Sequence, residues 1–132
     1  MTIMEYYFNK TVSGTFEDVI QTVKELLMDE GFGVLTEIDV DQVFKKKLDV
    51  DFPRYKILGA CNPQFAYKAL QNENKIGTML PCNVIVRETE DRKVEVAAVD
   101  PVASMMAVDN PTLADIAEEI RNRLSWVVQN VN

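Results

Sequence analysis

The two cysteines of the chain are the residues with the most distinctive chemistry. Cys61 lies in the stretch ILGACNPQFA and Cys82 in the stretch MLPCNVIV, and each is followed directly by asparagine. Two neighbouring thiols could form a redox disulfide or bind a soft metal such as Cu(I) or Zn(II). Because two sulfurs supply only half of the ligands of a zinc site, we expect neither a bound metal nor a cofactor.

Each cysteine also has a purely structural interpretation. Cys61 precedes Asn62, a strong helix N-cap, and Pro63, which suits the first position of a helix. A thiolate beside that helix N-terminus would be stabilised and its pKa would fall. Alternatively, Cys61 is a small apolar residue at a strand end. Cys82 falls on the apolar side of an alternating strand, which indicates a place in the core.

Further candidates lie where strands begin or end. Pro81 begins the strand that holds Cys82, and Asp100-Pro101 ends the next strand. Such residues cap elements, and they could also form the rim of a ligand pocket at one end of a sheet. The candidate site residues are Cys61, Asn62, Pro63, Pro81, Cys82 and Asp100.

Tyrosines could line the pocket itself, because each has an apolar ring and a polar tip. Tyr6, Tyr55 and Tyr67 are the candidates, with core packing as the alternative role for each. In folds of this kind a ligand is often held between the helices and the sheet, so we expect the pocket there, by analogy with other folds.

Several functions are excluded or disfavoured by composition. The chain has no histidine, which excludes Ser-His-Asp and Cys-His nucleophiles as well as histidine-bearing zinc sites. It has no glycine-rich nucleotide-binding motif. The net charge of −7 disfavours nucleic acid as a partner, and the cluster Lys45-Lys46-Lys47 is short and flanked by aspartates. Without a recognisable catalytic set, we expect a protein that is not an enzyme.

Length and composition indicate one cytoplasmic domain. The chain has 132 residues, of which 47% are apolar and 27% are charged, as in a globular domain with one core. No apolar run approaches the roughly 20 residues of a membrane span. The N-terminus MTIMEYYFNK lacks the pattern of a secretory signal, so we expect a cytoplasmic protein with reduced thiols.

Periodicity predicts the elements that must position these residues. Alternating apolar residues indicate strands and apolar residues at helical spacing indicate helices, in the order β-α-β-α-β-α-β-β-α. This order predicts an α+β two-layer sandwich in which two long helices cover one face of a mostly antiparallel, curved sheet of about five strands. The expected strands span 4–12, 33–38, 54–60, 79–88 and 94–98, and the expected helices span 15–30, 39–49, 63–72 and 111–129.

Three blocks resemble a known family. They are YKILGACNPQFAYKAL, IGTMLPCNVIVRE and VEVAAVDP, and together they resemble the signature of the domain-of-unknown-function 302 family. The resemblance implies an α+β fold of the TATA-binding-protein-like class and pairing as homodimers. No catalytic activity is established for the family. Many members lack cysteine at the position of Cys61 or Cys82, so a thiol cannot be what the whole family needs.

Two main functions remain open from the sequence, besides a lesser one, a hydrolase or isomerase with carboxylate chemistry. The first is a non-enzymatic, dimeric module that binds a small-molecule ligand or serves as an accessory protein. The alternative is a thiol-based redox or soft-metal-handling protein that uses Cys61 and Cys82.

Overall fold

A curved antiparallel sheet is the frame of the computed structural model, which describes residues 5–132. The strands run in the order β1-β5-β4-β3-β2, and each neighbouring pair is antiparallel. Strands β2 to β5 therefore lie side by side in chain order, whereas β1 pairs with β5 and not with β2. The five strands are β1 (Tyr7–Val12), β2 (Gly33–Asp39), β3 (Tyr55–Cys61), β4 (Cys82–Glu88) and β5 (Val94–Val99).

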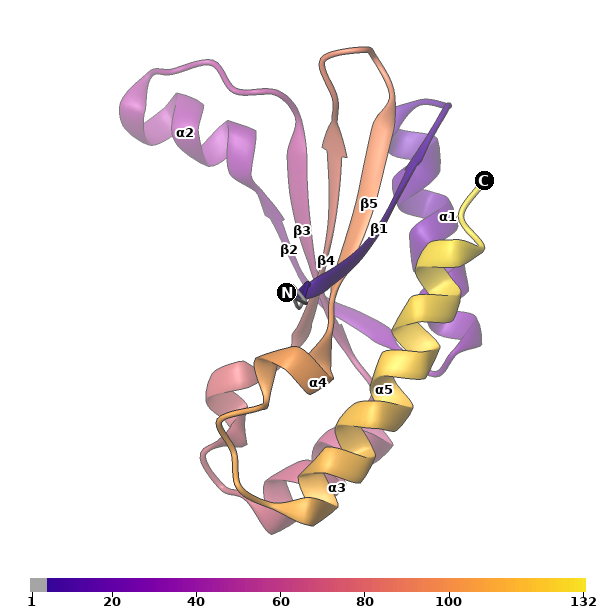
Figure 1. The fold of residues 1–132 in the computed structure, drawn as a ribbon. Helices are drawn as coiled ribbons and strands as arrows, with labels where there is room; N and C mark the ends of the chain where they lie inside the picture. The colour runs from indigo at the N-terminus through magenta and orange to yellow at the C-terminus, as the bar shows by residue number, and fades with distance from the viewer. Residues whose placement is uncertain (1–4) are drawn as a thin grey trace, which may run out of the picture.

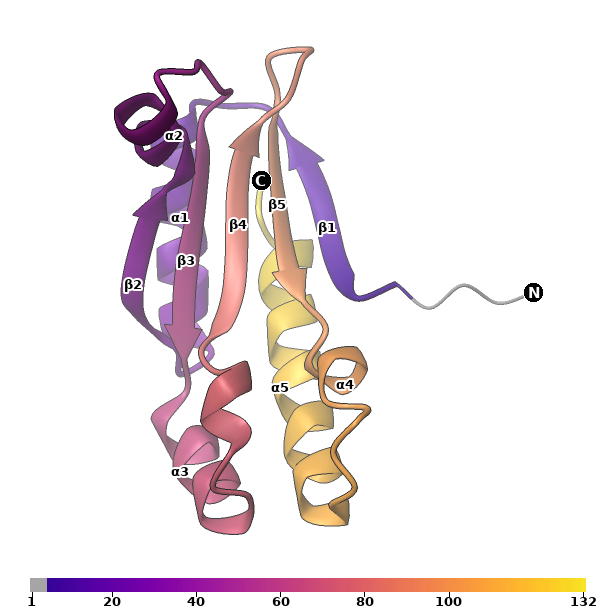
Figure 2. The ribbon, with the colours of Figure 1, turned by 90° about the vertical axis from the view of Figure 1, so that its left-hand side faces the viewer.

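The two long helices, α1 and α5, cover one face of this sheet (Figure 1). The opposite face carries no long helix, and Figure 2 looks directly onto it. The short helix α2 projects on that open side, whereas α3 and α4 lie beyond one end of the strands. The helices are α1 (Phe16–Asp29), α2 (Val40–Leu48), α3 (Pro63–Asn72), η1 (Ile76–Met79, a 3₁₀ turn), α4 (Pro101–Ser104) and α5 (Pro111–Gln129).

The predicted α+β sandwich is confirmed, with three local corrections. Met79, expected to begin a strand, instead ends the 3₁₀ turn η1, and β4 begins at Cys82. The helix α4 was not predicted. It fits because Asp100 accepts a hydrogen bond from the backbone N–H of Val102, 3.0 Å away, and so caps a helix that Pro101 begins. The first strand begins at Tyr7 rather than at residue 4, which lies outside the described residues.

The long helices begin and end as their sequences predict. Thr15 caps α1 by accepting a hydrogen bond from the N–H of Asp18 at 3.1 Å, and Asn110 caps α5 by accepting from Thr112 at 3.1 Å. Gly31 follows α1 with a φ of +85°, a conformation that costs glycine little.

The core lies between the covered face of the sheet and the two long helices. Its side chains come from alternate positions of the strands and from one stripe of each helix. Fully burying such a side chain stabilises the fold by about 1.5–3 kcal/mol. The fully buried members include Val23 and Leu27 of α1, Leu58 of β3, Val84 and Val86 of β4, Val96 of β5, and Leu124 and Val127 of α5.

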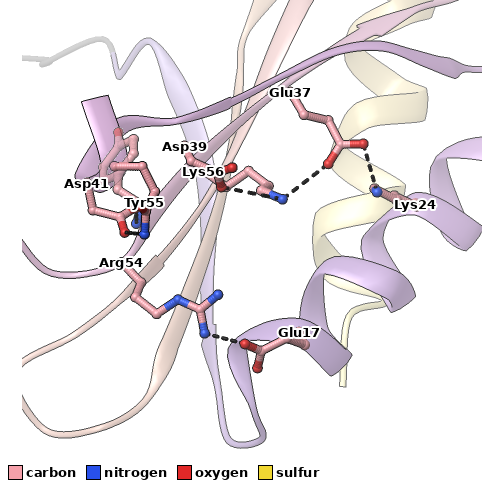
Figure 3. A network of polar contacts seen from close by, with 9 residues as sticks. Glu17, Lys24, Glu37, Asp39, Asp41, Arg54, Tyr55 and Lys56 are labelled. Carbon is pink, nitrogen blue, oxygen red and sulfur yellow. Dashed lines mark hydrogen bonds and ion pairs between the residues drawn. The ribbon is translucent and has the colours of Figure 1, made fainter. Parts of the chain in front are cut away.

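Ion pairs join α1 to the β2–β3 edge of the sheet (Figure 3). The carboxylate of Glu37 on β2 lies 2.9 Å from Lys24 Nζ on α1 and 3.2 Å from Lys56 Nζ on β3. Arg54 pairs with Glu17 at the other end of α1. These pairs are partly exposed and screened by solvent, so they mainly fix the helix against this edge. Within residues 5–132, none of the helices combines the length and the apolar character that crossing a membrane requires.

Candidate functional site

The sequence-predicted residues gather at one end of the sheet, around an apolar hollow that we name the basal cavity. The register pairs Ala60 of β3 with Cys82 of β4, so both cysteines lie at the same strand ends. The cavity measures about 30 Å³ and is walled by the sheet, α3 and α5. That volume holds about one water molecule, and the walls are almost wholly apolar. Its lining includes Cys61, Asn62, Pro81 and Cys82, together with Pro101 next to Asp100, but not Pro63.

Burial makes both thiols poor nucleophiles. Both cysteines are free, and burial raises the pKa of Cys61 above its usual value. Burial raises the pKa of Cys82 to about 11, and the nearby Cys61 adds to the shift. The lowered pKa that a helix N-terminus would have given Cys61 is therefore wrong in direction, because desolvation dominates. Within residues 5–132, no group of three or more histidine, cysteine or acidic side chains is arranged to hold a metal ion.

The side chain of Asn62 links the start of α3 to the end of α1 and does not cap α3. Asn62 is buried, and its side chain makes no capping hydrogen bond to α3, contrary to the sequence prediction. Its Nδ2 instead donates to the carbonyl oxygen of Glu30 at 3.4 Å, and Arg123 donates to the same oxygen at 3.1 Å. Pro63 does occupy the start of α3 as predicted. The end of α1 is thereby joined to the start of α3 and to α5.

Asp100 also has a structural role that its burial explains. Besides capping α4, its carboxylate lies 3.3 Å from Nε of Arg121 on α5. Its side chain is only 10% exposed, so the cap and the ion pair together satisfy a carboxylate that burial would otherwise destabilise. Asp100 fixes α4 and α5 against the end of β5 and does not project into the basal cavity.

A larger hollow lies on the opposite, open face of the sheet, and we name it the open-face cleft. It measures about 450 Å³, which falls in the range of small-molecule sites. Its lining residues come from β3, β4, β5 and the start of β1. Its lining residues are Tyr6, Tyr7, Tyr55, Asn83, Ile85, Arg87, Glu95, Ala97, Ala98 and Val99.

Strand register explains why these side chains meet. Directly paired residues of neighbouring strands point to the same face of a sheet. Ile85 pairs with Ala97, which gives the cleft an apolar floor. Two residues further along β4, Arg87 pairs with both Tyr55 and Glu95, which gives a polar row across three strands.

Within the polar row, both carboxylate oxygens of Glu95 accept hydrogen bonds. Arg87 Nε donates to Glu95 Oε1 at 2.6 Å, and Asn9 Nδ2 donates to Glu95 Oε2 at 2.8 Å. Burial by itself raises the pKa of Glu95, but the hydrogen bonds from Asn9 and Arg87 outweigh it and hold this pKa below its usual value. Burial raises the pKa of Tyr55, although the positive charge of Arg87 opposes the shift. Near neutral pH the carboxylate is therefore ionised and the phenol is protonated.

These protonation states suit binding rather than proton transfer. A general acid or base works best when its pKa lies near the operating pH, whereas Glu95 and Tyr55 are shifted away from neutrality in opposite directions. The cleft offers an apolar floor, aromatic walls and fixed hydrogen-bonding groups, which are the features of a site that orients a ligand.

Sequence reasoning identified the cleft only in part. Tyr6 and Tyr55 line a hollow, as expected of tyrosines, but on the open face rather than between helix and sheet. Tyr67 is 66% exposed and lines neither hollow. Arg87 and Glu95 were missed, although the alternation of β4 and β5 places both opposite the core face and could have indicated a shared site.

Comparisons with known proteins place the chain among relatives without an assigned activity. The family model described as "Domain of unknown function DUF302" matches residues 8–131. A crystal structure of an uncharacterized conserved DUF302 protein from Bacillus stearothermophilus superposes with a TM-score of 0.90. The two chains are 28% identical, over 98% of this chain and 100% of the other. No curated protein matches the chain.

Proposed function

The chain belongs to the family defined by the domain of unknown function DUF302, and we propose that it is a non-enzymatic module that binds a small organic molecule in the open-face cleft. The observation that carries the proposal is the cleft of about 450 Å³ on a sheet face that no long helix covers. Neither the family model nor the similar crystal structure names a ligand, so the proposal depends on the geometry alone.

Three features of the cleft support ligand binding. Its floor of Ile85 and Ala97 is apolar, so a bound molecule would remove apolar surface from water. The tyrosines at its sides combine large apolar rings with hydroxyl groups. The ion pair of Arg87 and Glu95 would orient a bound ligand in the cleft. The basal cavity, at about 30 Å³, lacks the volume for an organic molecule.

Filling the cleft provides the test. We expect 2-naphthol, a neutral flat probe, to bind the wild-type protein in isothermal titration calorimetry. The variant Ala97→Phe places a ring on the cleft floor and should weaken binding at least about tenfold. Ala114→Phe is the matched control, because Ala114 is exposed on α5 and lies outside the cleft lining. Equal affinity of wild type and Ala97→Phe would refute the proposal.

We also propose that the module is a homodimer that pairs through the α2 arm, defined as residues 40–52. The α2 helix buries no residue against its own chain. Its arm exposes Leu48 by 65% and Phe52 by 44%. The helix is acidic where it begins, at Asp39 and Asp41, and basic where it ends, at 45–47. An antiparallel α2 helix from a second copy would therefore place opposite charges beside each other.

Mass measurement tests the dimer. In light scattering coupled to size-exclusion chromatography, the wild type should give twice the chain mass of 15.0 kDa. Leu48→Glu should give 15.0 kDa, because a charge would replace an apolar contact. Met28→Glu alters an exposed apolar residue on α1 and serves as the control. A wild type of single-chain mass, or a dimer that persists in Leu48→Glu, would overturn this assignment.

The thiol-based alternative keeps one supporting observation, the shared position of Cys61 and Cys82 at the basal cavity. Raised pKa values for both thiols disfavour it, since the thiolate is the form that attacks disulfides and binds metals. Two free cysteines agree with the proposed cytoplasmic location of a single-domain protein, where thiols stay reduced.

A further inference from the structure

We propose, on the basis of the proposed function, that the ligand of the open-face cleft is an aromatic carboxylate. Its ring would lie over the floor of Ile85 and Ala97, and its carboxylate would meet the terminal amino groups of Arg87. This assignment narrows the ligand from any small organic molecule to one chemical class.

The free hydrogen-bonding capacity of Arg87 gives the first argument. Its Nε is occupied by Glu95 Oε1 at 2.6 Å, but within residues 5–132 neither Nη1 nor Nη2 has a protein partner. The side chain is 42% exposed and belongs to the lining of the cleft. The two terminal amino groups of a guanidinium form a planar fork that matches the two oxygens of a carboxylate.

Glu95 gives the second argument. It holds the guanidinium of Arg87 in place, and its carboxylate has no free oxygen with which to bind a cationic ligand. Both of its oxygens already accept hydrogen bonds, one from Arg87 and one from Asn9. Its side chain is only 15% exposed, which leaves little of it to contact a ligand. An anion therefore finds open donors in the cleft, whereas a cation finds its only carboxylate covered.

Aromatic walls give the third argument. Tyr6 and Tyr7 meet edge to face, with ring centroids 4.9 Å apart and planes at 70°. Tyr55 faces them from β3 across the cleft, near enough to be influenced by the Tyr6 phenol. A flat ring between such walls makes offset or edge contacts on both sides, each worth about 0.5–1.5 kcal/mol beyond area burial.

The net charge of the whole chain does not prevent an anionic ligand from binding in the cleft. The net charge is −7, but interactions across more than about 8 Å are largely screened at 0.15 M salt. Arg87 and Glu95 are the only charged side chains among the lining residues, and Asn83 contributes an uncharged amide. Binding is therefore best measured at that salt concentration.

The experiment compares 2-naphthoate with 2-naphthamide, which has the same ring and shape but no charge. In calorimetry at pH 7 and 0.15 M salt, the acid should bind at least about tenfold more tightly than the amide, as expected for charge-assisted hydrogen bonds. Arg87→Gln should abolish this preference. Lys93→Gln removes the same charge from the exposed β4–β5 turn and should keep it.

A second variant covers the case in which Arg87→Gln does not fold. Arg87→Gln combined with Glu95→Gln removes the pair together and keeps the net charge, and it too should bind acid and amide alike. If the amide binds the wild type as tightly as the acid, the carboxylate assignment is wrong while ligand binding in the cleft still holds. If neither probe binds, both the assignment and the proposed function fail. A preference for the acid that survives in both variants would also overturn the role of Arg87.

Discussion

Burial affects the side chains of the two hollows in opposite ways, depending on whether a partner is present. Cys82 is buried in an apolar wall without a charged partner, so its neutral form is favoured and its pKa rises to about 11. Glu95 is also buried, but two hydrogen-bond donors hold it in its charged form. The basal cavity therefore suppresses ionisation, whereas the cleft maintains a fixed pair of charges.

The first prediction concerns thiol reactivity. With a pKa of about 11, Cys82 has roughly one thiolate in a thousand at pH 8, and its burial also limits access. A chromogenic disulfide reagent should therefore leave Cys82 unmodified in the native Cys61→Ser variant. In denaturant the same variant should react fully, which serves as the control. Rapid native reaction of Cys82 would revive the thiol-based function.

The second prediction concerns Asp100. Asp100→Ala should lower the free energy of unfolding by about 2–3 kcal/mol, because it removes the α4 cap and leaves Arg121 without its partner. Asp100→Asn keeps the capping oxygen and should lose less. Urea denaturation measures both changes. Equal stability of Asp100→Ala and wild type would show that α4 is held by other contacts.

At the scale of elements, the close approach of β3 to its neighbours explains why residue 59 is a glycine. A Cβ at Gly59 of β3 would lie 2.1 Å from Oγ1 of Thr36 on β2 and 2.8 Å from Cγ of Pro81. The register between β2 and β3 shifts between Val34 and Thr36, next to this contact. Gly59 thus lets the edge strand and the segment before β4 pack closely together.

The third prediction follows from this contact. Gly59→Ala should lower the free energy of unfolding by about 1–3 kcal/mol, as overpacking does elsewhere. Gly33→Ala is the matched control, since a Cβ at Gly33 meets nothing within 4 Å. Thermal or urea denaturation of the two variants should separate them clearly. Similar stabilities would contradict the packing described at Gly59.

Element types were predictable from local patterns, and their contacts were not. Thr15 and Asn110 signal helix starts through their own side-chain chemistry, which sequence displays directly. Asn62 has the same signature, but the nearby Glu30 carbonyl takes its side chain away from capping. The turn η1 ends at Met79, shortly before the alternating residues of β4 begin, so periodicity alone assigned Met79 to the strand.

At the scale of the whole molecule, the two faces of the sheet differ in what covers them. Both long helices pack on one face, which buries the alternating positions that sequence reasoning had assigned to the core. The other face is left with aromatic, charged and small residues, and the order of the strands brings Tyr6 and Tyr55 to one cleft. Pairing of β1 with β5 is a long-range choice that no local pattern reveals, so the cleft could not be assembled from sequence alone.

The fourth prediction concerns stability against pH. Because the folded pKa of Glu95 lies below its unfolded value, its contribution is present above about pH 4.5 and is lost as the pH falls through the folded pKa. Glu95→Gln should therefore be less stable than wild type at pH 7, with a gap that narrows below about pH 4.5. Glu90→Gln, in the exposed turn, is the control. A gap independent of pH would contradict this account.

The most direct test of the central claim is to locate a bound probe by NMR. In ¹⁵N-labelled wild-type protein, 2-naphthol should shift the amide signals of cleft residues, with the largest changes at Tyr55, Ile85, Arg87 and Ala97. Signals of Phe65, Ala69 and Ile120 around the basal cavity should stay in place. Shifts concentrated at those three residues, or no shifts in the cleft at saturating probe, would contradict the claim that the open-face cleft is the binding site.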